Sequence, residues 1–229
     1  LENGYHYTFT ELFELHRIQA EAQRHAGPDS TLWQRPPLSE QRDKLLLLRD
    51  NLIQAEAAMR RRDDHSVFSA YVRLAVQFAK SPDDIWLREH FLRYALSVAE
   101  RIKDDDGLKQ ALAYQYYGLA KEEKGERSRA PQLCELEKAC ANLAEFYKAC
   151  QGKDWVDDDG TLLSKLAARH LVRIFLTRVD KCDPQHLSDR IELCKRAHEI
   201  AHHCEFFTDY LQIVWHDWIS KRKLVGRNL

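Results

Sequence analysis

Hydrophobic residues recur every three or four positions along almost the whole chain, and they seldom alternate singly with polar ones. Typical runs are Phe9, Leu12, Phe13, His16, Ala20; Leu45, Leu48, Leu52, Ala55, Met59; and Leu163, Leu166, Ala167, Leu171, Ile174. One face of an α-helix repeats every 3.6 residues, so this spacing indicates helices rather than half-buried strands. We predict nine helices and no strand, the ninth being an aromatic segment between residues 206 and 219.

Short connections between the predicted helices indicate that sequential helices turn back and pack antiparallel. The expected hairpins pair residues 65–80 with 84–103, 108–124 with 130–150, and 161–180 with 186–203. The helix around Leu112 and Tyr116 carries a second apolar stripe, which a helix packed on two sides requires. The predicted fold class is therefore all-α, an α-solenoid of antiparallel helical hairpins.

Three positions carry the chemistry of a helix start. Thr8 and Glu11 have the spacing of a capping box, and Ser81 and Asp183 each precede a proline at a first helical position. Residues 27 to 39 are rich in Pro and Gly and are interpreted as an extended surface linker. We expect two domains: an N-terminal helical extension with this Pro-rich linker over residues 1–62, and a helical repeat domain over residues 63–229.

One hairpin carries residues at the spacing of a tetratricopeptide repeat (TPR). Tyr114 and Tyr117 are large, Gly118 stands where the paired helix crosses closely, Gly125 is expected in the turn, and Ala130 opens the second helix. The predicted hairpins are longer than the regular repeat, so the fold is expected to be TPR-like rather than regular.

The N-terminal string from Gly4 to Phe13, with Phe-Thr-Glu-Leu-Phe at its end, resembles the opening of the tetratricopeptide repeat protein 29 family of motile cilia. Three later islands follow in the same order: Lys44-Leu45 with Ala55-Glu56-x-Ala58, Trp86-Leu87-Arg88-x-His90-Phe91, and Tyr117-Gly118-Leu119. The resemblance implies a non-catalytic scaffold of the axoneme that supports dynein-driven motility. The partners it implies are other axonemal proteins, such as dynein complexes or doublet microtubule components, and the implied location is the cytoplasm, cytoskeleton and axoneme of a cilium or flagellum.

Composition limits the other classes of partner. Lys and Arg total 35 and Asp and Glu total 36, a formal net charge of -1. Because this net charge gives no strong positive electrostatic field, the chain is not expected to bind nucleic acid. Because it has no long apolar run, it is not expected to insert into a membrane. The six cysteines form no C-x-x-C pair and are interpreted as reduced core thiols of an intracellular protein.

A string typical of zinc hydrolases spans His198, Glu199 and His202. Two histidines four residues apart on a helix can hold zinc, with the glutamate as general base. The downstream positions of a metzincin hold Glu205 and Thr208 instead of Gly and a ligand. We therefore predict no metal, no cofactor and no enzymatic activity, and keep a zinc-dependent hydrolase as the alternative. Asp157 to Gly160 fits a calcium loop poorly and is interpreted as helix capping.

Protein binding is the function that we expect, on two surfaces. Tyr71, Tyr114, Arg169 and Arg173 are candidates to line a concave groove made by the first helices of the hairpins. The aromatic C-terminal segment is the other surface, with Tyr210, Trp215 and Trp218 as candidates. A cytosolic TPR adaptor without a ciliary role is a further alternative.

Overall fold

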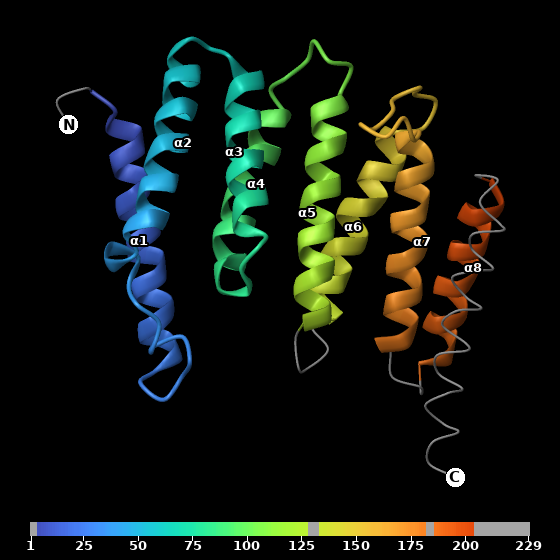
Figure 1. Cartoon of the computed structure of the whole chain (residues 1–229). Helices are drawn as coiled ribbons and strands as arrows, with labels where there is room; N and C mark the ends of the chain where they lie inside the picture. Colours follow the sequence, from blue (N-terminus) through green and yellow to red (C-terminus); the bar gives the residue numbers. More distant parts are fainter. Residues whose placement is uncertain (1–3, 128–132, 182–185, 204–229) are drawn as a thin grey trace. The chain divides into compact units, whose positions relative to one another are not determined.

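A computed structural model describes residues 4–127, 133–181 and 186–203, and the regular secondary structure of these residues is helical (Figure 1). The helices are α1 (His6–Ala26), α2 (Arg42–Arg60), α3 (Asp64–Phe78), α4 (Ile85–Ala99), α5 (Leu108–Arg127), α6 (Leu133–Ala149), α7 (Leu163–Lys181) and α8 (Leu187–His203), with short 3-10 helices at Leu38–Glu40 and Pro82–Asp84. The all-helical class and the three predicted hairpins are confirmed. The ninth predicted helix and the start at Asp183 lie outside the described residues.

The chain forms two compact units, Leu1–Lys103 and Asp104–Leu229. The predicted boundary between residues 62 and 63 marks where the helical repeats begin, and it is a different division from that into compact units. It stays a prediction. None of the helices in the described part of the chain has the length and apolar character that a bilayer crossing requires.

In the first unit, α1 packs on α2, α2 on α3, and α3 on α4. The pairing of α3 with α4 is antiparallel, because Asp64 at the start of α3 contacts Arg101 just after α4, while the Tyr71 ring lies 5.5 Å from the Tyr94 ring, centroid to centroid, in the middle. The aromatic rings of Tyr71, Phe78 and Phe91 form the centre of this hairpin. Burial of these rings supplies much of its apolar stabilisation.

In the second unit, α5 packs on α6, α6 on α7, and α7 on α8. Gly118 lies where α6 crosses closely, since a Cβ atom there would be 2.8 Å from Cγ of Leu143. That prediction is confirmed. Gly125 is not in a turn, as predicted, but inside α5, where a Cβ atom would be 2.7 Å from Cδ2 of Leu136. The two glycines, seven residues apart, let α5 approach α6 along two helical turns.

Residues 27 to 39 lie mostly at the surface, as predicted, but the prediction that they are extended is wrong. This segment contains turns and a 3-10 helix, and it buries Leu38. The side-chain amide of Gln19 in α1 makes two hydrogen bonds to the C-terminal part of this segment. It accepts from the Leu38 backbone N–H (2.6 Å) and donates to the Pro36 carbonyl (3.3 Å). Gln23, one turn further along α1, donates to the carbonyls of Leu32 and Arg35. Side chains of α1 therefore provide hydrogen-bond partners for backbone groups of a loop that has little regular secondary structure.

The predicted capping box at Thr8 is also wrong, because α1 begins two residues earlier, at His6. The first turn of α4 does follow a proline, Pro82, although the Ser81 side chain makes no capping hydrogen bond. Asp105 caps the start of α5, accepting from the backbone N–H groups of Gly107 (3.1 Å) and Lys109 (2.8 Å).

Candidate protein-interaction site

Helix α1 buries three polar side chains, Thr8, Glu11 and Gln19, beside Leu15, and it exposes two aromatic rings. Its buried residues include Thr8 and Glu11, whereas Phe9 is 44% exposed and Phe13 is 70% exposed. Phe9 and Phe13 are four residues apart and so share one side of the helix. Hydrophobic periodicity alone would assign these two rings to the core. The structure instead presents them to solvent on a helix that is held by other means.

Glu56 of α2 holds the start of α1. Its Oε2 accepts hydrogen bonds from both the backbone N–H and the hydroxyl of Thr8, each at 2.8 Å. The first turn of a helix has N–H groups without intrahelical partners, so Glu56 caps α1 from a neighbouring helix. Burial raises the pKa of the Glu56 carboxyl, but the hydrogen bonds from Thr8 and Arg60 outweigh it and hold the pKa below its ordinary value.

Glu11 ties the middle of α1 to α4. Its carboxylate lies 2.5 Å from Nε2 of His90 and accepts from the Tyr94 hydroxyl at 3.3 Å. Both Glu11 and His90 are buried. A carboxylate in such a position is stable only while its partners remain, so this cluster fixes where α1 sits on α4.

Tyr71 belongs to the same buried cluster and not to an open groove. The residue is 2% exposed, and its hydroxyl lies 3.0 Å from that of Tyr7 in α1. Burial and the Tyr7 contact raise the pKa of Tyr71, and burial together with Glu11 raises the pKa of Tyr94 to about 12. A partner protein has no access to Tyr71 in this structure, so the sequence-based expectation that it contacts one does not fit its burial.

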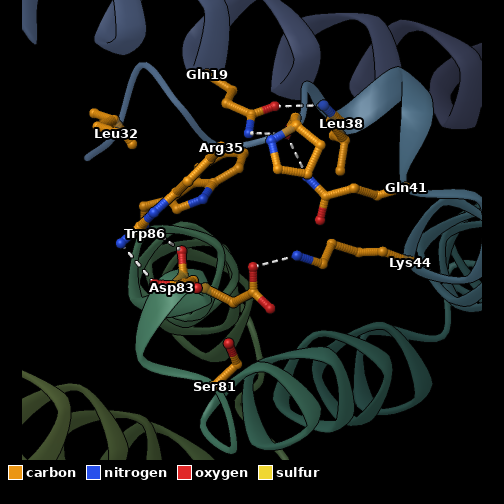
Figure 2. A pocket seen from close by; sticks show the side chains of 11 residues that line it. Gln19, Leu32, Arg35, Leu38, Gln41, Lys44, Ser81, Asp83 and Trp86 are labelled. Atoms are coloured by element: carbon orange, nitrogen blue, oxygen red, sulfur yellow. Dashed lines mark hydrogen bonds and ion pairs between the residues drawn. The ribbon is translucent and has the colours of Figure 1, made fainter. Parts of the chain in front are cut away.

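A polar clasp closes the base of the first unit, where the loop after α1 meets the turn before α4 (Figure 2). Lys44 pairs with Asp84, and Arg35 pairs with Asp83 at 2.6 Å. The clasp surrounds a pocket of about 150 Å³ that Trp86 also lines. Each of these two cations has an acidic partner, so the clasp holds the loop in place rather than offering free charge to a ligand.

The N-terminal string and the first two of the three later islands lie in this unit, whereas Tyr117-Gly118-Leu119 lies on α5 in the second unit. Glu11 comes from the N-terminal string, Glu56 from the first later island and His90 from the next. Glu56 accepts a hydrogen bond from Thr8 of α1, and His90 contacts Glu11 of α1. The islands thus carry the residues that attach α1, and with it the exposed Phe9 and Phe13.

In the second unit, two of the predicted groove residues lie on α7. Arg173 makes a bidentate ion pair with the buried Glu122 of α5, with N···O distances of 2.9 and 2.6 Å. Arg169 is exposed one turn earlier. Tyr114 of α5 is half-buried and packs against the apolar cluster around Phe146. One ion pair thus joins the first helices of these two hairpins, and the groove between them stays a prediction. Contact of these residues with a partner stays a prediction.

His170 lies between Arg169 and Arg173 in the sequence, and the positive charges of both residues affect its pKa. Burial, together with Arg173 and Arg169, lowers the pKa of His170 to about 4. Its Nε2 lies 3.5 Å from the amide of Gln115.

We expect His170 to stay neutral in the folded chain well below the ordinary histidine pKa. The folded state then binds fewer protons than the unfolded state, so stability should fall as the pH drops from about 6.5 towards 4, by up to about 1.4 kcal/mol per pH unit. Histidine ring NMR titration measures the pKa directly. In His170→Gln, the urea-derived stability should decline less steeply over this interval, and an unchanged slope would contradict the assignment.

The zinc-type string lies on α8 with His198, Glu199 and His202 all exposed. The two histidine rings are 6.4 Å apart, centroid to centroid. Across the described ranges, no group of three or more His, Cys, Asp or Glu side chains is arranged to hold a metal ion. Asp157, in the acidic loop, accepts from the backbone N–H groups of Asp159 and Thr161, at 3.0 and 2.7 Å, which stabilises the turn before α7.

Two sequence-based expectations concern other parts of this unit. Tyr210, Trp215 and Trp218 lie outside the described residues. Of the cysteines that the structure describes, Cys150 is buried, with its pKa raised to about 11 by burial. Cys134 is exposed, so it is not a core thiol as expected.

Sequence reasoning missed the residues that anchor α1. Glu11, Glu56 and His90 are charged or polar types that usually lie on the surface. One available signal was their position: Glu11 lies three residues from Thr8, so both fall on the side of the helix opposite Phe9 and Phe13.

Most of the chain aligns with known proteins of one kind. Across 202 residues, the chain is 35% identical to tetratricopeptide repeat protein 29 of Macaca fascicularis and of Homo sapiens, and 34% identical to that of Mus musculus. The aligned region is 88% of this chain, and the chain spans about 40% of the length of these relatives. No protein-family model matches the chain.

Proposed function

Because this similarity assigns the chain to the tetratricopeptide repeat protein 29 family, we propose that it is a non-catalytic scaffold of the ciliary axoneme. In this role it binds dynein-associated or doublet-microtubule proteins and supports the beating of cilia or flagella. TPR-type helical repeats act by offering preformed surfaces to other proteins. The ciliary part of the proposal is supported by the resemblance of the N-terminal string and its three companion islands.

The observation that carries protein binding is the exposure of Phe9 and Phe13 on a helix that is fixed in place. Large apolar rings side by side on a surface favour a protein contact, since covering them removes apolar area from water. The buried contacts of Glu11 and Glu56 hold α1, so little conformational entropy is lost when a partner covers these rings. Aromatic side chains on a rigid element are typical of the residues that contribute most to an interface.

The groove face of α7 is the second surface in this proposal. Arg169 is exposed there, and the Arg173–Glu122 pair keeps α5 and α7 in register. Exposed charge at the rim of an interface mainly affects association rate and specificity, so we assign this face a supporting role.

The test is retention of the tagged chain on axonemes from motile ciliated cells after detergent extraction. We expect Phe9→Ser combined with Phe13→Ser to reduce retention about tenfold, as loss of two aromatic anchors should. Val76→Ser is the matched control, because Val76 is also apolar and 51% exposed but lies on α3. Equal retention of both variants would contradict the assignment to α1, and wild-type chain that stays in the cytosol would favour the adaptor without a ciliary role.

A further inference from the structure

A cleft of about 320 Å³ lies between α2 and α3, beside the turn that joins them. Ala57 of α2 and Ala70 of α3 are among its lining residues, and their small side chains leave room between the two helices. The other lining residues are polar or positively charged: Gln54, Arg61, Ser66 and Arg73.

The two arginines give this cleft a positive charge. Arg73 donates from Nη1 to the side-chain oxygen of Gln54 at 2.9 Å, and this acceptor is neutral. Arg61 is exposed at the C-terminal end of α2. Neither guanidinium forms a salt bridge with any carboxylate that the structure describes, in contrast to Arg35, Arg60, Arg101 and Arg173.

The acidic residues nearest in sequence are already engaged. Asp63 caps α3, accepting from the backbone N–H of Ser66 at 3.0 Å and from its hydroxyl. Asp64 pairs with Arg101 at 2.8 Å. Because both carboxylates are used within the fold, Arg61 and Arg73 keep donors available at the cleft.

We propose that the cleft between α2 and α3 binds an acidic segment of a partner protein, with its Glu or Asp carboxylates received by Arg61 and Arg73. The planar guanidinium matches the two oxygens of a carboxylate, which gives direction as well as charge to the contact. The cleft is open to solvent and floored by small side chains, so it can admit side chains of an extended peptide. The inference rests on the proposed function only in taking a protein as ligand, and it does not involve Phe9 or Phe13.

The experiment uses the full chain and a fluorescein-labelled peptide, Ala-Glu-Glu-Ala-Glu-Glu-Ala, measured by fluorescence anisotropy at low salt. We expect the Arg61→Gln, Arg73→Gln double variant to bind at least about tenfold more weakly, since two charge-assisted contacts are lost. Arg24→Gln with Lys148→Gln is the matched control, because it removes two exposed positive charges elsewhere, and binding should change less than about twofold. Circular dichroism melting confirms that each variant is folded.

A second variant separates the cleft from general electrostatics. Ala57→Leu fills the cleft without changing any charge, and it should weaken peptide binding to a similar degree. Three results would overturn the proposal: no binding by the wild-type chain, equal weakening in the matched control, or binding of inorganic phosphate alone with the same arginine dependence. In the first and third cases the axoneme retention test stands unaffected, so failure here is distinct from failure of the scaffold role.

Discussion

A chain carrying Gly118→Val should lose roughly 3 kcal/mol of its free energy of unfolding, because the new side chain overpacks the α5–α6 contact. Even a single Cβ atom at this position would be 2.8 Å from Cγ and 2.9 Å from Cδ2 of Leu143, with the Leu143 backbone nitrogen at 3.3 Å. Leu143 is fully buried, so any shift of its side chain disturbs the packed core around it. Urea unfolding measures the loss, and hydrogen exchange should localise it to α5 and α6.

A double-mutant cycle makes this expectation specific. Alanine is favoured over glycine inside a helix by about 1 kcal/mol, so Gly118→Ala would stabilise the chain if no steric conflict existed. In the wild-type chain the contact with Leu143 should cancel or reverse that gain. In a Leu143→Ala background, where the opposing side chain is absent, Gly118→Ala should be stabilising. Stabilisation by Gly118→Ala in both backgrounds would contradict a close crossing at this glycine.

The second large effect concerns the anchor of α1. Glu11→Ala should cost about 3 kcal/mol, because the buried His90 and the half-buried Tyr94 would lose their acceptor. We expect the amide protons of α1 to lose protection in hydrogen exchange before those of α3 and α4, since the change releases one helix rather than the whole unit.

Glu14→Ala is the matched control for this prediction. Glu14 is also a glutamate of α1 in an ion pair, but its pair with Arg17 is solvent-exposed, and its removal should cost less than about 1 kcal/mol. Equal costs for the two changes would show that the Glu11 cluster does not anchor α1. A Glu11→Leu, His90→Leu double variant should recover part of the stability, because it removes both polar partners together.

The helical period of the sequence predicted most of the fold and little of the site. Three hairpins were predictable because Tyr71, Leu136, Leu171 and residues like them recur at helical spacing and are buried. Gly118 was predictable because a glycine inside a helical pattern indicates close approach. Gly125 was misassigned because glycine also favours turns, and only the position of Leu136 distinguishes the two cases.

The polar attachment of α1 could not be predicted from periodicity. Hydrophobicity assigns Phe9 and Phe13 to the core, whereas the tertiary partners Glu56 and His90 select the opposite face of the helix. These partners lie on α2 and α4, far away in the sequence, so local patterns do not contain the information. The acidic residues after Pro82 also have partners that are distant in the sequence, because the carboxylates of Asp83 and Asp84 pair with Arg35 and Lys44.

Site-specific photocrosslinking in motile ciliated cells tests whether this chain holds axonemal proteins through Phe9 and Phe13 of α1. A photoreactive phenylalanine analogue replaces Phe13 in one chain and Val76 in another, and crosslinked proteins are identified by mass spectrometry. We expect crosslinks from position 13 to dynein-associated or doublet-microtubule proteins that are absent from position 76. The same crosslinks from both positions, or none from position 13, would contradict this expectation.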